Sequence, residues 1–475
     1  MAAGAEGFTV LTKTLVVILP DKTHARKNLK CKSSVAAVSS VLGYAAPVRV
    51  CSVLLALCAV FAACGRSGLW LTGTSAPAPH GWNGGLPADI PDNIWSWWVH
   101  PLAVNDVDVT WVGGIARDAT VKITRVNADS SIETIALGQT EADEHNGPAI
   151  AYHPDHTDLV LFFSQHNTDN RVHYRRVDRE SLALGVPEEL QFSGLVTYAQ
   201  VLVRGDRIVL LTRVASVSWC YRISEDFGST WSEERALIDG NGRGLVYVLA
   251  KPVRSDPSQA QFAFYGHPTS SGFRDVLYGS IDLDTGVVGS GGGINLGDLD
   301  TEGGPGLRPV VPAGKPALET ALHPSPGYVV RMLDVGELDG MPAIAYAEWT
   351  GTEAPNYRVI LRDKAGGWSS APWTLPTGVV FGYVPDIHYH GGAAFTRDDG
   401  VISSREEAGT WKVERWRWDT TLGDLVLAEE LSATPKPVIR PYVPYHDGRA
   451  DVVVHELDRY KGYTDYRAAT RFLVP

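Results

Sequence analysis

Two histidine-asparagine pairs, His145-Asn146 and His166-Asn167, lie in the most histidine-rich part of the chain. A turn and the apolar run LVLFFS (159–164) separate the pairs, so a hairpin would fold both to the same end of one sheet. Imidazole titrates near neutral pH and suits general acid or base chemistry. His145 and His166 are therefore candidate catalytic residues, with Asn146 and Asn167 as candidate donors to a substrate. The alternative is that polar loop residues simply collect there.

The first of these pairs follows two carboxylates, Asp143 and Glu144, which together with histidines could bind a divalent ion. The spacing matches no compact zinc motif such as H-E-x-x-H. We therefore assign no metal ligand and expect catalysis to require no cofactor.

A phenol and a guanidinium flank a second predicted hairpin. Tyr198 opens the apolar run TYAQVLV, and Arg213 lies near the end of the next run, with the turn at Arg204-Gly205-Asp206 between them. Neighbouring antiparallel strands can place both side chains on one rim. From these residues alone, the alternative is a packed aromatic ring and a surface arginine.

The elements that must position these groups are short strands. Runs of four to nine residues rich in Val, Ile, Tyr, Phe and Trp recur between turn residues, and no stretch keeps helical spacing. The chain has 48 Gly, 29 Pro and 14 Trp, a composition that suits many strands joined by tight turns. The predicted class is all-β. Because the length exceeds that of one β-sandwich, four-stranded sheets repeated around an axis fit better.

One turn matches a specific pattern. SEDFGSTW (224–231) has the Asp-box form S-x-D-x-G-x-T-W. We expect Asp226 to hold the turn through backbone hydrogen bonds, Gly228 to adopt positive φ and Trp231 to fill the blade core. The pattern is structural, so it assigns no catalysis. Seven blades would take about 56 residues each, a normal blade size, and six blades are the alternative.

The N-terminal part has the features of a targeting segment. In residues 48–64, VRVCSVLLALCAVFAAC, a positive charge precedes an apolar run too short to span a membrane comfortably and of the right size for a secretory signal. The ending FAAC resembles a bacterial lipoprotein cleavage site with Cys64 as the lipidated residue, and ordinary signal cleavage is the alternative. We expect a secreted or cell-surface bacterial lipoprotein, attached to a membrane only through Cys64.

These features divide the chain into three parts: residues 1–64 as an extension with the signal, 65–88 as a linker, and 89–475 as the propeller. Four of the five cysteines fall in the first part, which leaves Cys220 with no partner for an intramolecular disulfide. The hydrophobic content of 44% excludes a disordered chain, and the net charge of −12 argues against a non-specific nucleic-acid binder.

Several segments, in order, resemble the BNR-4 type propellers, which include ulvan lyases and related rhamnosyl-glucuronate lyases. The resemblance covers about residues 90–470. The segments that carry it are WSWWVHPLAV (95–104), TWVGGI (110–115), DEHNGPAI (143–150), FFSQHN (162–167), TYAQVLV with LTRV, YGHP (265–268), YHGGAAF with VISSREEAGTWKVERW (389–416), RPYVPYHDG (440–448) and RYKGYTDYRAAT (459–470).

The resemblance implies a seven-bladed β-propeller that cleaves the α-L-rhamnose-(1→4)-glucuronate linkage of an acidic polysaccharide by β-elimination and leaves an unsaturated uronate end. The family's two histidines correspond to His145 and His166, and its Tyr and Arg to Tyr198 and Arg213. Tyr247 and His390 are further candidates for substrate binding. A structural calcium or zinc ion is left open by the resemblance, and we expect a monomer.

The chemistry suits these residue types. β-Elimination removes the C5 proton beside the uronate carboxylate, whose charge an arginine can neutralise through a paired hydrogen bond. Arg213 is the candidate for that role. A histidine and Tyr198 form the acid/base set, with the order between them left open.

Two other functions compete with a lyase. One is a propeller-type glycoside hydrolase, acting on rhamnosyl-glucuronate or resembling a sialidase. The other is a non-catalytic glycan-binding propeller, in which an aromatic rim of Trp95, Trp97 and Trp98 would stack on sugars.

Overall fold

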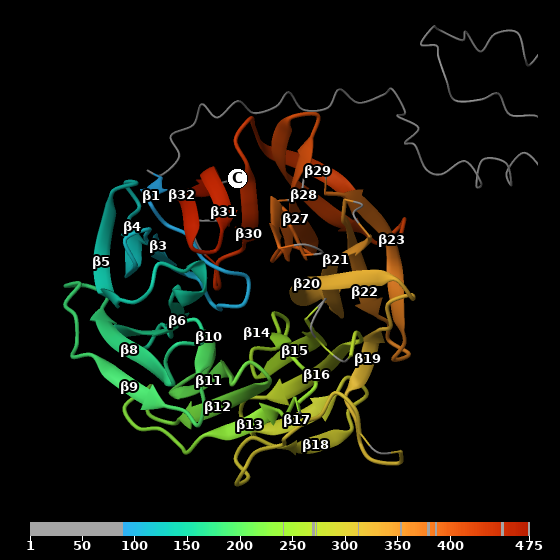
Figure 1. Cartoon of the computed structure of the whole chain (residues 1–475), viewed down its shortest axis with the longest axis horizontal. Helices are drawn as coiled ribbons and strands as arrows, with labels where there is room; N and C mark the ends of the chain where they lie inside the picture. The colour runs from blue at the N-terminus through green and yellow to red at the C-terminus, as the bar shows by residue number, and fades with distance from the viewer. Residues whose placement is uncertain are drawn as a thin grey trace, which may run out of the picture. The chain divides into compact units, whose positions relative to one another are not determined.

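A computed structural model describes residues 89–473, apart from positions 241, 268–270, 272, 312, 352–353, 378–380, 385–386 and 448–450. The described chain forms eight antiparallel sheets, of which seven are blades arranged in a ring and one is a two-stranded hairpin (Figure 1). The predicted all-β class and seven blades are confirmed. Residues 1–64, with Cys64, and the linker 65–88 lie outside the described residues, so the signal and the lipid site stay predictions. No helix in the described part has the length and apolar character needed to cross a bilayer.

The blades are numbered along the chain, and each is given from its inner to its outer strand. Blade 1 consists of β2 (Ala103–Asp106), β3 (Val109–Ile115), β4 (Thr120–Val126) and β5 (Ile132–Gln139). Blade 2 consists of β6 (Ala149–Ala151), β7 (Asp158–Ser164), β8 (Arg171–Asp178) and β9 (Glu188–Gln191). Blade 3 consists of β10 (Val196–Arg204), β11 (Arg207–Val214), β12 (Ser218–Ser224) and β13 (Arg235–Ile238). The 3₁₀ turn η1 (Glu144–Asn146) precedes blade 2.

Blade 4 is the largest because β17 and β19 both pair with β16, and β18 extends β17. Its strands are β14 (Val246–Pro252), β15 (Gln259–Gly266), β16 (Val276–Asp282), β17 (Val287–Ser290), β18 (Asn295–Asp298) and β19 (Glu319–Leu322). Blade 5 consists of β20 (Tyr328–Leu338), β21 (Met341–Thr350), β22 (Asn356–Arg362) and β23 (Trp368–Pro376). Blade 6 consists of β26 (Gly392–Phe395), β27 (Gly400–Glu407), β28 (Thr410–Asp419) and β29 (Asp424–Thr434). Between them in the chain lies the hairpin of β24 (Phe381–Val384) and β25 (Ile387–Tyr389).

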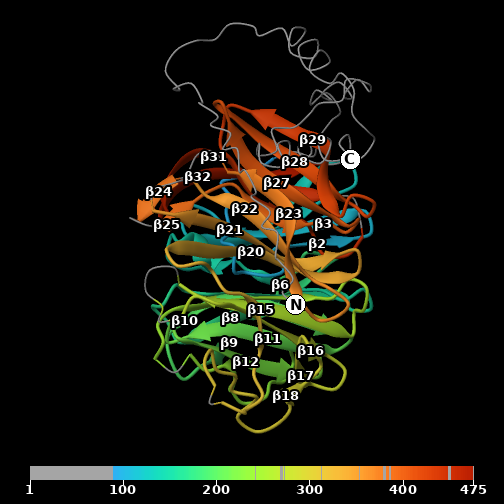
Figure 2. The same cartoon turned by 90° about the vertical axis from the view of Figure 1, so that its right-hand side faces the viewer.

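Blade 7 joins both ends of the described chain. It consists of β30 (Val438–Tyr442), β31 (Val452–Gly462), β32 (Asp465–Leu473) and β1 (Ile90–Pro91). The outermost strand therefore comes from the N-terminal side, and it pairs antiparallel with β32 through Ile90 opposite Thr470. This pairing closes the ring. Figure 2 shows the blades from the side, with the strands of each blade stacked edge to edge.

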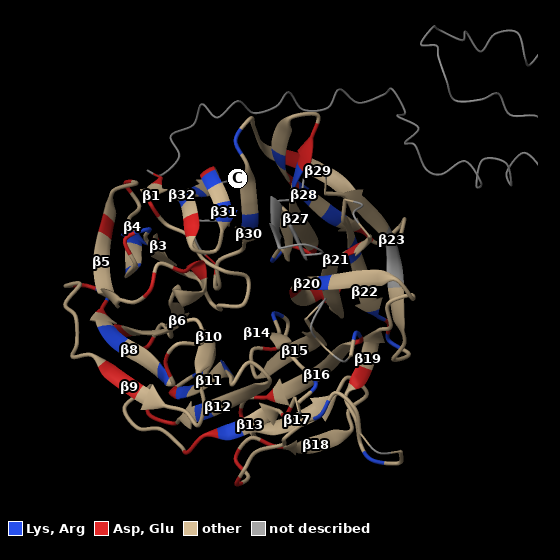
Figure 3. Ribbon diagram, in the orientation of Figure 1, with Lys and Arg blue, Asp and Glu red and all other residues tan. Residues whose placement is uncertain are grey.

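Burial follows the position of a strand in its blade. Every residue of β7 after Asp158 is buried, because neighbouring blades cover both of its faces. On β8 buried and partly exposed residues alternate. The outer strands carry the charges, as the blue and red segments on β8 and β9 in Figure 3 show. Arg171 on β8 lies 2.8 Å from Glu189 on β9.

The tryptophan-rich segment before β2 differs from the expected opening strand. Residues 95–99 form no strand, and Trp95, Trp97 and Trp98 are at most 7% exposed, so the predicted aromatic rim is wrong. The segment instead runs between blades. The Nε2 group of Gln200 donates to the Trp98 carbonyl (3.1 Å), and the His100 amide donates to the Ala199 carbonyl (3.2 Å).

The turn after β12 has the contacts that the Asp-box pattern predicts. The carboxylate of Asp226 accepts hydrogen bonds from the backbone amides of Ser229 (3.0 Å) and Thr230 (2.7 Å), and Gly228 has φ of 85°. Trp231, expected in the core of its own blade, packs across to blade 2, with its ring 5.6 Å from that of Phe162.

A buried ion pair ties blade 2 to blade 7. Arg440 on β30 donates to both carboxylate oxygens of Glu144 in η1 (2.9 and 2.7 Å) and also to the Trp95 carbonyl. The two side chains are 1% and 0% exposed. Since Glu144 lies between Asp143 and His145, this pair fixes the loop that carries the first histidine.

We predict that Arg440→Met lowers the free energy of unfolding by about 3–5 kcal/mol, because it leaves the Glu144 carboxylate buried without its partner. Urea denaturation of the whole chain measures this. The matched control is Asp284→Asn, which breaks the exposed pair between Arg204 and Asp284 (2.8 Å) and should cost about 0–1 kcal/mol. Equal, small losses in both variants would contradict the role of the buried pair.

Candidate functional site

The hairpin of β6 and β7 brings the two predicted histidines together. His145 precedes β6 in η1 and His166 follows β7, and the strands pair with Ala149 opposite Phe162. The imidazole centroids lie 4.1 Å apart with an interplanar angle of 28°. The expectation that both histidines reach the same end of one blade is confirmed.

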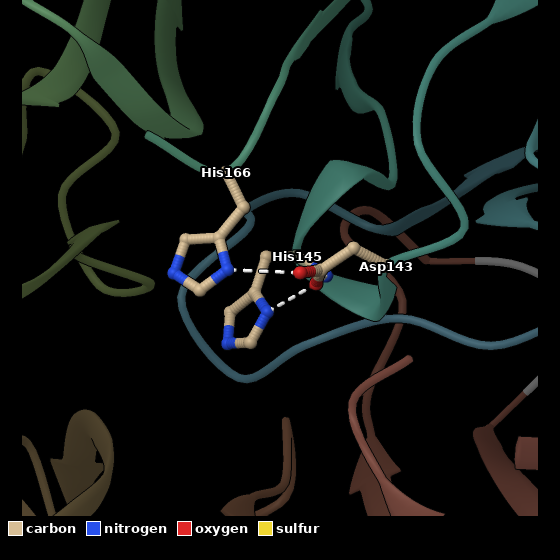
Figure 4. A group of neighbouring side chains, drawn as sticks. All are labelled: Asp143, His145 and His166. Carbon is tan, nitrogen blue, oxygen red and sulfur yellow. Dashed lines mark hydrogen bonds and ion pairs between the residues drawn. The ribbon is translucent and has the colours of Figure 1, made fainter. Parts of the chain in front are cut away.

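One carboxylate holds both imidazoles. The Nδ1 atom of His166 lies 2.9 Å from Oδ2 of Asp143, and Nδ1 of His145 bonds to Oδ1 of the same side chain (Figure 4). The backbone amide of His145 also donates to Oδ1 at 2.9 Å. An ionised carboxylate accepts only, so each Nδ1 donates its proton to Asp143. Figure 4 shows both Nε2 atoms turned away from Asp143.

Burial and charge set the protonation of this cluster. Burial by itself raises the pKa of the Asp143 carboxyl, but the charge and hydrogen bonds of His145 and His166 outweigh it and hold that pKa well below its ordinary value. Burial, and then the charge of His145, lower the pKa of His166, although Asp143 partly opposes this. The group is therefore an ionised carboxylate next to an imidazole, His166, that stays neutral at neutral pH.

Tyr198 reaches the same cluster through a distortion of β10. The register between β10 and β11 shifts between Thr197 and Gln200, and Tyr198 has φ of 69°, which is strained for a bulky residue. Its carbonyl accepts a hydrogen bond from the Thr212 hydroxyl (2.8 Å). Its ring centroid lies 5.4 Å from that of His145. A bulge here turns the phenol toward the histidine pair.

Arg213 on β11 lies beside Tyr198, as the hairpin predicts. Its guanidinium carbon lies 4.8 Å from the ring centroid of Tyr198 and 5.2 Å from that of Tyr247 on β14. The side chain is 2% exposed, and among the residues that the structure describes its Nε and Nη1 groups find no hydrogen-bond acceptor. A buried cation that lies against aromatic faces and has donors without acceptors is suited to bind an anion.

Tyr247 belongs to this group, and His267 extends it. Tyr247 stacks against Trp98 with ring centroids 4.3 Å apart and lies 5.8 Å from the ring of His267. Burial, followed by the charges of Arg331 and Arg213, lowers the pKa of His267 to about 4. His267 is therefore a neutral donor or acceptor between two guanidinium groups.

Three predicted substrate-binding residues have hydrogen-bond partners within the protein. Asn146 is fully buried, and its amide donates to the Glu141 carbonyl (3.1 Å), so it holds its own loop. The amide of Asn167 donates to the Ser216 hydroxyl (2.5 Å). His390 is fully buried just before β26, with Nδ1 3.3 Å from the hydroxyl of Tyr357 on β22 of blade 5. The role of these three side chains in substrate binding stays a prediction.

Asp143 and Tyr463 also belong to the site, although the sequence predicted a catalytic role for neither of them. Asp143 was considered only as a metal ligand, although its position two residues before His145 is the signal for a carboxylate-imidazole pair. Tyr463, in the turn between β31 and β32, places its ring edge-on 5.1 Å from His145 and 5.3 Å from His166. Burial and the charge of Asp143 raise its pKa. Nothing in the local sequence could have placed it here, because this contact depends on ring closure.

Asp143, His145 and His166 also form a set of potential metal ligands, with one atom from each within 4.8 Å of the others. The donor set of two imidazoles and a carboxylate is one that zinc accepts. In this geometry the Nδ1 atoms bond to the carboxylate, so an ion held by them would have to replace those hydrogen bonds. The expectation that catalysis requires no metal stays a prediction.

No protein-family model matches the chain, and no curated protein matches it. Among solved structures, the chain is similar to a polysaccharide lyase of family PL25, an ulvan lyase bound to -[GlcA(1-4)Rha3S]-, with 13% identity and a TM-score of 0.61 over 82% of this chain and 95% of that one. A second structure of a PL25 ulvan lyase gives 14% identity, the same TM-score and the same coverage. At such identities the likeness shows a shared propeller fold, and the resemblance to BNR-4 propellers stays a prediction.

We predict that Asp143→Asn lowers the pKa of His166 further, because the carboxylate charge that stabilises its imidazolium is removed. Histidine ring resonances followed by NMR across pH measure this, with His166 assigned from a His166→Gln variant. Asp155→Asn is the control, since Asp155 is an exposed carboxylate 3.8 Å from His153 in a different loop. An unchanged His166 titration in Asp143→Asn would show that the carboxylate does not control the imidazole pair.

Proposed function

We propose that the protein is a polysaccharide lyase that cleaves the α-L-rhamnose-(1→4)-glucuronate linkage of an acidic polysaccharide by β-elimination. The observation that carries the proposal is the buried Arg213 guanidinium, whose Nε and Nη1 have no acceptor in the described part of the chain, near a pair of imidazoles whose Nε2 atoms point away from Asp143. A uronate carboxylate supplies the missing anion, and the C5 hydrogen beside it supplies the proton that a base removes.

Arg213 pairs with the uronate carboxylate and stabilises the negative charge that develops on it as the C5 proton leaves. Its planar guanidinium can donate two parallel hydrogen bonds to the two carboxylate oxygens. The faces of Tyr198 and Tyr247 keep water from this cation and strengthen the interaction.

His166 is the proposed base. Its lowered pKa keeps Nε2 unprotonated at neutral pH, and Asp143 fixes the ring through Nδ1. Nε2 takes the C5 proton, the electrons of that C–H bond form the C4–C5 double bond, and the C4–O4 bond breaks. The departing O4 takes a proton from Tyr198, whose ring lies beside His145. The products are an unsaturated uronate end and a free hydroxyl on the other fragment.

The substrate class rests on the solved ulvan lyase, which binds an oligosaccharide of glucuronate and sulfated rhamnose and has the same fold. We propose the same class here, with the protein acting as a monomer secreted or held at the cell surface through Cys64. A structural calcium or zinc ion away from the reacting groups is compatible with this proposal.

The first test is an assay of the whole mature chain on a panel of uronate polysaccharides that includes ulvan. The expected result is a product that absorbs in the ultraviolet as an unsaturated uronate, with activity retained in EDTA. Chain cleavage without that absorbance would replace the lyase with a hydrolase. Binding of the polymer without cleavage would indicate a glycan-binding propeller.

The second test separates the roles of the residues. We expect His145→Ala, His166→Ala and Arg213→Ala each to lower kcat by at least about a hundredfold, the usual scale for acid/base and charge-stabilising groups. Arg213→Lys should lose most of the activity as well, because an ammonium keeps the charge but lacks the paired donors. The matched control is His153→Ala, since His153 lies at the opposite end of the same hairpin. Normal turnover in His166→Ala would remove it from the mechanism.

A further inference from the structure

A cavity of about 400 Å³ opens at the C-terminal ends of inner strands, whereas His145 lies just before the start of the inner strand β6. The cavity is bounded by the last residues of β14, β20 and β26 and by the segment after β30. The inner strand β14 extends from one face to the other. Tyr247 near its start belongs to the candidate active site, and Lys251 near its end lines this cavity. The inner strands run in the same direction around the ring, as the parallel bridge between Val104 and Tyr445 illustrates.

The charged groups around this cavity are already paired within the protein. The ammonium of Lys251 lies 2.5 Å from Asp334, which is 2% exposed. The other pairs are Arg254 with Asp399 (2.6 Å), Arg397 with Asp447 (3.3 Å), and Glu337 with the amide (3.0 Å) and hydroxyl (2.5 Å) of Ser255. Among the described residues that line the cavity, Lys251, Arg254 and Arg397 therefore each have a carboxylate partner, unlike Arg213 on the other face.

Three neutral polar groups that line the cavity, those of Gln261, Tyr445 and Thr396, have unused hydrogen-bonding capacity among the described residues. Gln261 is 1% exposed and lies directly opposite Lys251 in the β14–β15 register. Its Oε1 accepts from the Tyr278 hydroxyl (3.3 Å), whereas its Nε2 has no acceptor within the described ranges of the chain. The buried hydroxyl of Tyr445 likewise has no partner among those residues. A buried amide left unpaired is costly, so a ligand that accepts from it would gain this energy.

Most of the remaining lining is apolar, and Thr396 and His446 also belong to it. The apolar side chains include Pro252, Val335, Phe395, Val443 and Pro444. A sugar ring combines the two chemistries that this wall offers, since its C–H face packs on aromatic and proline rings and its hydroxyls both donate and accept. The volume lies within the range of pockets that hold small molecules.

We propose that this cavity is a binding site for a neutral sugar unit. Its hydroxyls would accept from Gln261 Nε2 and exchange hydrogen bonds with Tyr445, while its apolar face would lie against Phe395. A uronate is disfavoured, because Lys251 and Arg254 are already neutralised and the Glu337 carboxylate would repel it. The site does not depend on the proposed lyase activity, although it would allow a polymer bound at the active site to be held at a second point.

Saturation-transfer NMR and calorimetry on the whole chain test this, with L-rhamnose, D-glucose and D-glucuronate as probes. We expect weak, saturable binding of the neutral sugars and weaker binding of glucuronate. Val253→Trp should abolish it, because Val253 is a partly exposed residue of the cavity wall and a larger side chain there fills the space without changing a buried contact. Gln261→Leu should weaken it about tenfold, the loss of one hydrogen bond.

His166→Ala serves as the control, since it alters the other face and should leave sugar binding unchanged while lyase activity falls. Thermal melts check that Val253→Trp stays folded. Absence of neutral-sugar binding to the unmodified chain, full binding in a folded Val253→Trp protein, or tighter binding of glucuronate would each overturn the proposal. Loss of lyase activity with sugar binding retained would bear only on the proposed function.

Discussion

The site depends on closure of the ring. Because β1 pairs with β32, blade 7 is fixed next to blade 1, and its turn at Tyr463 comes to lie against η1 of blade 2. The backbone carbonyl of Tyr463 accepts from the Glu144 amide (3.0 Å), and Arg440 of blade 7 binds the Glu144 side chain. The loop that carries the first histidine is thus held by residues that lie about 300 positions further along the chain. Without ring closure, that loop would lose its contacts with Tyr463 and Arg440.

Within this fold, the Asp143 carboxylate and the Arg213 guanidinium have separate electrostatic roles in the site. Asp143 is ionised and satisfies both Nδ1 groups, which leaves the two Nε2 atoms free for proton transfer. Arg213 provides the positive charge and has aromatic faces rather than carboxylates around it. If Asp143 paired with Arg213 instead, neither the imidazole orientation nor the open anion position would remain. Their separation on different blades keeps the two charges from neutralising each other.

Much of the fold could be predicted from sequence because strand patterns are local. The apolar runs at 158–166 and 207–214 correspond to β7 and β11, and the turn at Gly205-Asp206 joins β10 to β11 as expected. His145 meets His166, and Tyr198 meets Arg213, each within a single hairpin. The apolar runs and the turns between them were therefore sufficient to predict both contacts.

Contacts between blades could not be predicted in this way. Tyr463 reaches the histidines only through ring closure, and Trp97 is buried because its segment crosses between blades instead of forming a strand. His390 lies in one of the segments that resemble the family, and its buried side chain contacts Tyr357 on β22 of blade 5. The bulge at Tyr198 is equally invisible in sequence, since no glycine or proline marks it.

The cationic side chains at the two ends of the inner strands have different partners, and the ligand proposed for each end follows from this difference. On one face Arg213 is held by rings and can gain only from an anion. On the other, Lys251 is neutralised by Asp334, whose oxygens also accept from the amides of Val335 (2.9 Å) and Phe395 (2.8 Å). Burial and the charge of Lys251 hold the pKa of His100 well below its ordinary value, so it adds no charge. Under the two proposals, a polymer of alternating uronate and neutral sugar units would present its acidic unit to Arg213 and its neutral unit to Gln261.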